Sequence, residues 1–428
     1  MRGGARKGGT ASTVHRVTPG RAPVVAIAAL VLLGLTCTAC GSGHGHKGRS
    51  DVLRVPQTYA TIQAAVDAAR PGDLVLIAPG VYHQSVTVST GRDRIVLRGL
   101  DRNRVVLDGQ NRLGSGITIH ADGVAVENLT VRRYLVNGVV WTPSFGYGGG
   151  RAIQGWRGSY ITAYDNGLYG VYAFGAEHGR FDHVYASGQP DSGIYIGDCN
   201  PCDALVIDSV AEHNQVGYEA TNASRDISVT HNVWRDNRVG LEIDSLRAEP
   251  GFPQEVSVVA DNQVVDNNNR GAPRSEEGGF GAGIVIDGGS SNQVADNLVS
   301  GHSEVGIVVL DSPDSVATNN TVRANRLDAN ALDLALETAG GQSQGNCFAA
   351  NQAPGGGPRS IPARLEPLTE RSCGRSVPTG GGQLRLLPSP PEVNYETVPA
   401  PPPQPNMPAA ATAPARPAVG HPERETGG

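Results

Sequence analysis

Aromatic and carboxylate side chains follow one another at one position of a short repeated unit, and these residue types can act on sugars. The unit is glycine, aliphatic, variable, aliphatic, and four consecutive copies carry at the variable position Tyr172, Tyr195, Glu219 and Glu242. Phe174 lies two residues after Tyr172 and therefore on the same side of a strand. Flat rings stack on sugars, and paired carboxylates supply a general acid and a general base. We therefore predict that the three aromatic residues bind carbohydrate. The catalytic candidates are Glu219, Glu242 and Tyr195.

Carboxylates on neighbouring copies could move a proton or hold a cation. If the copies stack about 4.8 Å apart, Glu219 and Glu242 lie side by side, and their like charges raise the pKa of one of them. Asp244 and Asp287 follow two residues after the variable position of their own copies. Together with Glu242 they could bind calcium, which prefers oxygen ligands. A solvated acidic face without any ligand is the alternative for all four residues.

A lyase or an epimerase would need a base at a sugar C–H bond and a cation at the uronate carboxylate. Tyr195 or His183 could be that base, and Arg180 could neutralise the uronate and bind the sugar. Loops at residues 143–150 and 268–280 could wall a groove over these side chains. Single charged residues in loops are also common on protein surfaces, so this assignment stays open.

The spacing of the repeated glycines predicts the fold that positions these residues. Between residues 170 and 306 the glycines lie 23, 24, 23, 43 and 23 residues apart. Such a unit is long enough for one coil of three short strands and three turns, whose outward residues form columns along the stack. Within the longest interval, residues 268–279 contain Asn, Gly and Pro in a run that favours an inserted loop. The chain is therefore expected to be all-β, a solenoid with coils of 23 residues or so.

Two further patterns support stacked coils. Asparagines recur between the glycines, as at Asn232 and Asn262, where they tolerate sharp turns and can hydrogen-bond along the stack. Residues 59–70 have apolar residues at helical spacing, with Thr61 as the start and Pro71 as the stop. A stack of coils leaves apolar surface at its ends, so we expect this helix to cap the N-terminal end.

These motifs resemble a known family. The sequence TIQAAVD from Thr61, followed by PGD from Pro71 and PGVY from Pro79, resembles the opening of pectin-lyase-like β-helix proteins. The coils resemble the β-helix repeat that NosD-like proteins also contain. The resemblance covers about residues 55–350 and implies a single-stranded right-handed parallel β-helix. It leaves the activity open, because this fold carries lyases, hydrolases, esterases, epimerases and proteins without activity. The Asp-Pro-His motif of alginate epimerases and the signatures of polygalacturonases and pectate lyases are absent from the sequence.

The N-terminus predicts export. Residues 1–23 carry five basic residues and no acid, and residues 24–35 are an apolar run shorter than the roughly 20 residues that span a bilayer. Cys40 follows small residues and resembles the lipid-attachment cysteine of bacterial lipoproteins. We expect a signal peptide over residues 1–40 and a flexible tether over 41–54. A lipid on Cys40 would hold the chain at the outer side of the cell membrane; cleavage nearby and secretion is the alternative.

Four cysteines remain outside the signal segment: Cys199, Cys202, Cys347 and Cys373. An even number of cysteines in an exported chain favours disulfides. Pairing of Cys199 with Cys202, and of Cys347 with Cys373, is the simplest of three connectivities.

Charge and composition limit the partners and set the domain order. The chain carries a net charge of −6, and loss of the five basic signal residues changes this to −6 − 5 = −11. Such a charge disfavours nucleic acid as a ligand, because binding to phosphates needs clustered Lys and Arg. Pro, Ala and Gly dominate residues 375–428, so we expect a disordered, extended tail after a β-helix over 55–374.

Three functions remain open. The first is an exported, lipid-anchored monomer that binds polysaccharide or cell-wall glycan along the Tyr, Glu and Asp face, with calcium as the one conceivable cofactor. The second is a polysaccharide lyase, epimerase or hydrolase of unrecognised type. The third is a NosD-like accessory protein in metal-cofactor assembly. Binding of a polysaccharide without new sugar ends would favour the binding protein. New reducing or unsaturated ends would favour the enzyme, and association with a metal or a cofactor enzyme would favour the accessory protein.

Overall fold

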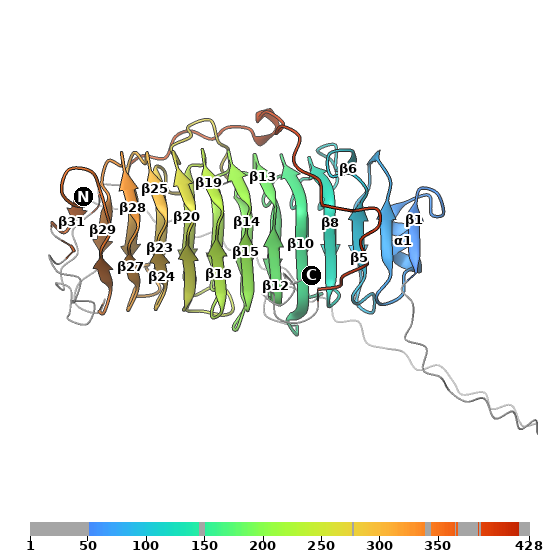
Figure 1. The fold of residues 1–428 in the computed structure, drawn as a ribbon, viewed down its shortest axis with the longest axis horizontal. Coiled ribbons are helices and arrows are strands. Elements are labelled where there is room, and N and C mark those ends of the chain that lie inside the picture. Colours follow the sequence, from blue (N-terminus) through green and yellow to red (C-terminus); the bar gives the residue numbers. More distant parts are fainter. Residues whose placement is uncertain are drawn as a thin grey trace, which may run out of the picture. The chain divides into compact units, whose positions relative to one another are not determined.

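Short strands stacked along one axis dominate the structure, which is a computed structural model (Figure 1). It describes residues 51–144, 150–275, 278–338, 344–363, 365–366, 384 and 387–418. All of them belong to residues 50–428, the second of the two units into which the chain divides. Strands of successive coils pair in parallel and form two sheets, which we call sheet A and sheet B.

Sheet B receives one strand from each coil that it crosses and has eleven strands. They are β4 (Val86–Val88), β7 (Ile117–Ile119), β9 (Val139–Trp141), β11 (Val171–Phe174), β14 (Ser192–Gly197), β17 (Val216–Thr221), β20 (Val239–Asp244), β23 (Ala282–Asp287), β26 (Val305–Leu310), β29 (Leu334–Glu337) and β31 (Ser360–Ile361).

Sheet A has twenty strands in two rows that meet at a sharp turn. The first row comprises β1 (Val52–Val55), β2 (Leu74–Ile77), β5 (Val96–Gly99), β8 (Val124–Arg132), β10 (Ile153–Tyr164), β12 (Ala176–Asp182), β15 (Ala204–Ile207), β18 (Ile227–Thr230), β21 (Ser257–Ala260), β24 (Gln293–Ala295), β27 (Thr321–Arg323) and β30 (Cys347–Ala349). The second row comprises β3 (Gly80–Tyr82), β6 (Val105–Asp108), β13 (Tyr185–Ser187), β16 (Val210–Glu212), β19 (Val233–Arg235), β22 (Gln263–Val265), β25 (Leu298–Ser300) and β28 (Arg326–Asp328). The long strands β8 and β10 continue from the first row into the second.

The register places equal positions of the repeat side by side, as predicted. Glu219 pairs with Glu242, and Asp244 pairs with Asp287. Because β20 pairs directly with β23, the 43-residue interval between their glycines is a single coil. Its extra residues lie in two loops, 245–256 and 266–281, and only the second was predicted.

Sharp turns within sheet A use the left-handed backbone that Asp and Asn tolerate. Asp208, Asp261 and Asp296 occupy the same turn of three coils, with φ of 51°, 56° and 57°. An asparagine follows this position in several coils, and Asn262 Nδ2 donates to Asn297 Oδ1 at 3.0 Å. The predicted asparagine ladder is therefore confirmed, and it satisfies polar groups between the coils.

Apolar side chains from all coils fill one continuous interior, which extends from Leu53 to Leu365. The repeated glycine is required where this interior meets the asparagine side chains. A Cβ on Gly217 would lie 2.5 Å from the carbonyl oxygen of Gly240 and 2.9 Å from Asn237 Nδ2. A side chain at this position would therefore push the coils apart, which explains why the repeat begins with glycine.

The predicted capping helix is confirmed as α1 (Ile62–Ala68), at the β1 end of the stack in Figure 1. The hydroxyl of Thr61 accepts a hydrogen bond from the backbone N–H of Ala64 at 3.1 Å, which caps the first turn. The helix ends earlier than expected because Ala69 adopts an extended backbone. Among the described residues, no helix is long and apolar enough to cross a membrane.

The C-terminal segment is mostly extended, as expected, and lies on the coils wherever the structure describes it. Residues 387–418 are extended, apart from the 3₁₀ turn η1 (Tyr395–Thr397) and a turn at residues 408–413, and run back along the coils (Figure 1). Arg238 Nη1 donates to the carbonyl of Pro390 at 2.9 Å, and Arg102 Nη1 donates to that of Pro405 at 3.2 Å. A proline-rich extended chain keeps its carbonyls free to accept hydrogen bonds, so arginines of the coils can hold it. We call residues 387–418 the docked tail.

The one disulfide with both cysteines among the described residues is the one predicted from the sequence. Cys199 and Cys202 are bonded, with their Cα atoms 4.7 Å apart. Cys347 is also disulfide-bonded, and its expected partner Cys373 lies outside the described residues. The predicted signal peptide with Cys40, and the tether before residue 51, lie outside them as well.

Candidate functional site

The outer face of sheet B carries the columns that the repeat predicted. The pairing register places in one line Tyr172, Tyr195, Glu219, Glu242 and Val285. Tyr218 and Ala220, on either side of Glu219, belong to the core, so the glutamate points outward. Aromatic residues therefore lie at one end of this face, carboxylates in the middle, and aliphatic residues at the other end.

Glu219 of β17 is held as a proton-bearing acid. Burial raises its pKa well above the usual range, and the carboxylates of Asp191, Asp244 and Glu242 raise it further. A hydrogen bond from the hydroxyl of Ser192, on the neighbouring strand β14, opposes this shift without cancelling it. A carboxyl group in this state keeps its proton at pH values where a free glutamate is ionised, and it can donate that proton to a leaving group.

Further carboxyl groups around Glu219 have oxygens that lack hydrogen-bond donors. Burial is the main cause that raises the pKa of Asp244 to about 7, and those of Asp287 and Asp198 to about 6. In each of these aspartates Oδ1 is buried and has no partner among the described residues, and the same holds for Glu249 Oε2. Buried acceptors without donors are costly and rare in folded proteins. These oxygens can accept hydrogen bonds from hydroxyl groups of a ligand.

Glu249 was not among the site residues predicted from the sequence. The side chain of Asn222 explains its position. Asn222 Nδ2 donates to the carbonyls of Leu246, Glu249 and Pro250 at 2.7, 3.2 and 3.0 Å. Its Oδ1 accepts from the backbone N–H of Leu246 at 3.0 Å. These bonds fold the loop 245–256 onto the end of sheet B. Loop residues lie outside the repeat, so only the length of the coil could have pointed to this insertion.

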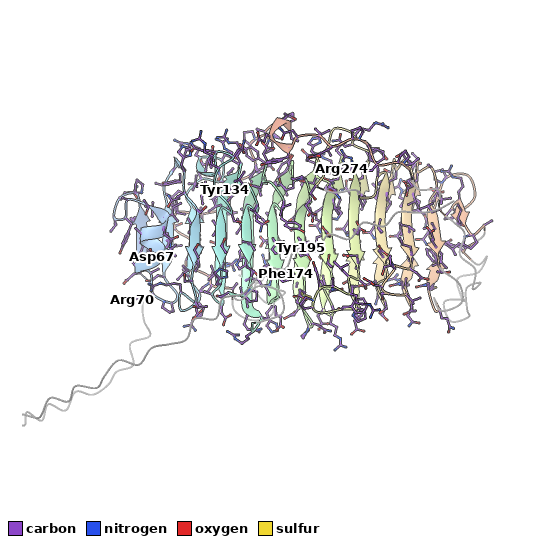
Figure 2. All side chains as sticks on the ribbon, turned by 180° about the vertical axis from the view of Figure 1, so that it is seen from behind. Asp67, Arg70, Tyr134, Phe174, Tyr195 and Arg274 are labelled. Carbon is purple, nitrogen blue, oxygen red and sulfur yellow. A yellow bond between two sulfur atoms is a disulfide. The ribbon has the colours of Figure 1, made fainter. Side chains whose placement is uncertain are left out.

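The aromatic residues form a packed stack and not an open platform. The rings of Tyr172 and Tyr195 stack with centroids 4.6 Å apart, and Tyr169 lies 4.6 and 5.0 Å from these two rings. Tyr195 is only 3% exposed and Phe174 only 5% exposed, and Figure 2 labels them close together near the middle of the stack. Of the three rings predicted to bind sugar, only Tyr172 is accessible enough to contact one directly.

The predicted role of Tyr195 as a base is not supported by its surroundings. Burial raises its pKa well above the usual range, and the nearby Tyr172 and Glu219 raise it further. The ring lies along its own strand over Gly197, where a Cβ would approach the Tyr195 hydroxyl to 2.4 Å. Tyr195 therefore keeps its proton and packs between neighbours, which suits a structural support of the face.

Arg180 and His183 are not part of this face, contrary to the prediction. Arg180 belongs to β12 in sheet A, where its Nε donates to Asp182 at 2.9 Å, and His183 follows that strand. The coil turns at Gly175, whose φ is 58°. Residues only a few positions after Phe174 therefore belong to sheet A and not to sheet B. The structure therefore separates the predicted uronate cation from Glu219 and Glu242.

The predicted calcium site is not formed either. No group of three or more His, Cys, Asp or Glu side chains that could hold a metal ion occurs in the part of the chain that the structure describes. Asp244 does pair with Asp287, but Glu242 faces Val285 on the next coil. An aliphatic residue thus stands where the site would need another oxygen ligand.

One family profile matches the chain, with the description "Right handed beta helix region", and it covers residues 115–326. No curated protein is a significant match by sequence. Similar solved structures include the A-module of mannuronan C-5 epimerase AlgE4 from Azotobacter vinelandii, with 16% sequence identity and a TM-score of 0.44. The match covers 70% of this chain and 94% of that chain. The enzymatically active domain of tailspike protein 2 from bacteriophage CBA120 has 13% identity, coverages of 73% and 45%, and a TM-score of 0.45. Pectate lyase Pel9A has 13% identity, coverages of 73% and 78%, and a TM-score of 0.37.

Likenesses at such low identity concern the fold and carry no information about activity. The family match and the stacked coils agree with each other over the same residues. The chain is a right-handed parallel β-helix protein.

Proposed function

We propose that this protein is a polysaccharide-cleaving enzyme, a glycoside hydrolase that cleaves between uncharged sugar units along the outer face of sheet B. The observation that carries the proposal is Glu219, an outward carboxyl group with a strongly raised pKa, beside the outward Glu242 of the next coil. A protonated carboxyl group next to a second carboxylate is the pair that glycoside hydrolysis requires.

The chemistry follows from the positions of these two side chains. Glu219 donates its proton to the glycosidic oxygen, so that the C–O bond breaks and the leaving sugar departs as an alcohol. Glu242 attacks the anomeric carbon or activates water, and one water molecule is added across the bond overall. Adjacent coils lie about 4.8 Å apart, close to the separation of about 5–5.5 Å in retaining enzymes. We therefore expect products that retain the anomeric configuration.

The charges of the face favour an uncharged substrate. The outward positions of β11, β14, β17, β20, β23 and β26 include four carboxylates and no Lys, Arg or His. A polyuronate would meet like charges there, whereas neutral sugars bring hydroxyl donors for the unpaired oxygens of Asp198, Asp244 and Asp287. This charge pattern makes a hydrolase of neutral glycans a better interpretation than a polyuronate lyase or epimerase.

The test is cleavage of a panel of neutral and uronate polysaccharides, followed through new reducing ends and unsaturated sugars. We expect reducing ends from a neutral polymer, and their loss by a factor of at least about 100 in Glu219→Gln, since general acid catalysis contributes that much. Glu337→Gln, on the same face but outside the carboxylate group, serves as the matched control. Retention of a polymer without any new ends would instead make this a binding face, and unsaturated ends would identify a lyase.

We also propose that the protein works outside the cytoplasm, held by a lipid on Cys40. The basic leader, the short apolar run and the small residues before Cys40 support this location. The test compares the membrane fraction of cells that express the natural chain or Cys40→Ser, after labelling with a radioactive fatty acid. Label and membrane retention that depend on Cys40 are expected; equal, unlabelled release of both chains would refute the lipid anchor.

A further inference from the structure

A polar cavity lies on another side of the coils, between sheet A and the docked tail. It has a volume of about 630 Å³, within the range of small-molecule sites in proteins. Its walls include Tyr160, Arg180, Asp182 and His183 from the coils, and Met407 and Pro414 from the docked tail. None of the residues assigned above to the sheet B face contributes to it.

The floor of this cavity is built from fixed polar groups. Tyr160 and His183 occupy the same left-handed turn in successive coils, with φ of 52° and 54°, and their rings stack 4.2 Å apart. His183 Nδ1 lies 3.1 Å from an oxygen of Asp182, which also accepts from the hydroxyl of Ser159 at 2.6 Å. Asp182 itself is only 3% exposed. The side chains are therefore held in place before any ligand arrives.

Arg180 supplies a donor that the fold leaves unused. Its Nε donates to Asp182 Oδ1 at 2.9 Å, and its side chain is only 13% exposed. Its Nη1 is buried and has no hydrogen-bond partner among the residues described. A buried guanidinium N–H without an acceptor is costly, and Arg groups recognise carboxylates preferentially. The unused Nη1 therefore points to an oxygen that a ligand provides.

The charge around the cavity also favours an anionic group. Arg157, Arg180 and Arg416 line it, together with Glu127, Asp182 and Asp208. Behind the wall, Arg98 forms an ion pair with Glu127 at 2.6 Å, and Arg102 interacts electrostatically with Tyr160 and Asp182. In and behind the cavity wall there are thus five arginines and three carboxylates, a balance opposite to that of the sheet B face.

The docked tail forms a fixed roof. Arg98 Nη1 donates to the carbonyl of Ala413 at 2.7 Å, and Arg98 Nη2 donates to that of Pro414 at 3.0 Å. The backbone N–H of Met407 donates to Asn128 Oδ1 at 2.7 Å. Because these bonds join the tail to strands β5 and β8, the cavity is a concave site of the folded chain and not an open surface.

We propose that this cavity binds one carboxylate-bearing sugar unit, with Arg180 Nη1 donating to the carboxylate. The Tyr160 hydroxyl and the exposed carboxylate of Asp208 accept hydrogen bonds from sugar hydroxyls. The site lies on sheet A and has the opposite charge balance, so it recognises a hexuronate that the sheet B face would repel. The enzyme would thereby hold an acidic part of a mixed glycan while it cleaves a neutral part.

The experiment titrates the full-length protein with glucuronate, galacturonate, glucose and inorganic sulfate, and follows binding by calorimetry and by ligand-observed NMR. We expect a uronate to bind in the millimolar range, and glucose and sulfate to bind at least about tenfold more weakly, which is 1.4 kcal/mol. Arg180→Lys keeps the positive charge but removes Nη1, and should weaken uronate binding about tenfold or more. Asp261→Asn, at the same turn position as Asp208 but outside the cavity, should bind like the natural chain.

Three results would overturn the proposal: no saturable uronate binding, equal binding of sulfate and uronate, or unchanged affinity in Arg180→Lys. Asp208→Asn is a second variant at an exposed position, where misfolding is not expected. Glu219→Gln should retain uronate binding, so failure of the cavity proposal and failure of the proposed hydrolase activity give different results.

Discussion

Arg98 and Glu127 form an ion pair with 2.6 Å between Nε and Oε2, although their side chains are only 0% and 2% exposed. Arg157, 7% exposed, pairs with the other oxygen of the same glutamate. Both arginines also donate to carbonyls of the docked tail. The pair therefore lies between the outer surface of sheet A and the docked tail, and it joins the two.

Removing the shared carboxylate should destabilise the protein strongly. Glu127→Gln leaves Arg98 and Arg157 buried without a counter-ion, which costs about 3–5 kcal/mol in comparable buried pairs. The free energy of unfolding in urea measures the loss. The control is Glu255→Gln, which breaks the exposed pair with Arg225 (33% and 56% exposed) and should cost less than about 1 kcal/mol. Equal effects of the two changes would contradict the importance of burial.

The docked tail should resist proteases in the folded protein. Arg238 donates to the carbonyls of Pro390 and Pro391 at 2.9 and 2.8 Å, so Arg238→Gln releases this stretch. We expect faster cleavage between residues 387 and 398 in the variant, measured by mass spectrometry of timed digests. Cleavage near residues 404–416, which other arginines hold, should stay slow. Rapid digestion of the whole tail in the natural chain would show that it is not docked.

One histidine should make stability depend on pH. His302 takes the place of an asparagine in a ladder, between Asn267 and Asn330, and burial lowers its pKa from 6.5 to about 4. The folded state binds fewer protons than the unfolded state, so stability is complete above pH 6.5 and falls as the pH drops towards 4, by up to about 3 kcal/mol. His302→Asn should remove this loss in melting curves recorded between the two pH values. A variant that kept the full acid sensitivity would assign it to other groups.

The carboxylates of the sheet B face should reduce stability at neutral pH. Burial raises the pKa of Asp244 from 3.8 to about 7, so the folded state holds its proton longer, and stability is lost as the pH rises through this interval. Asp244→Asn removes the ionisable group and should raise the melting temperature at pH 7 to 8, with little change near pH 4. The exposed Asp261→Asn is the control. A lower melting temperature for Asp244→Asn at pH 8 would disprove this assignment.

Much of the face of sheet B could be predicted because it depends on spacing alone. A constant coil length forces Glu219 next to Glu242 and Asp244 next to Asp287, whatever fills the loops. The interior positions and the asparagine ladder follow from the same period. Even the 43-residue interval was interpreted correctly as one coil, because turn-forming residues marked one of its insertions.

The remaining features depend on contacts that cannot be predicted from the spacing of the sequence repeat. Tyr195 is covered by Tyr169, which lies in the turn before β11 and not at a repeat position. The assignment of Arg180 failed because a turn at Gly175 moves it to another sheet, and sequence distance from Phe174 does not reveal that turn. The docked tail has no apolar pattern, since its backbone carbonyls and not its side chains provide many of its contacts with the arginines.

The contact between Arg98 and Ala413 joins residues that are 315 positions apart in the chain. A stack of coils can otherwise form from one end, because each coil contacts only its neighbours. Here the early coils acquire some of the acceptors for their buried guanidinium groups only after residues 413–416 have been synthesised. Their last stage of folding must therefore wait for residues 413–416, and a chain terminated before them would leave buried guanidinium N–H groups of its early coils without these acceptors.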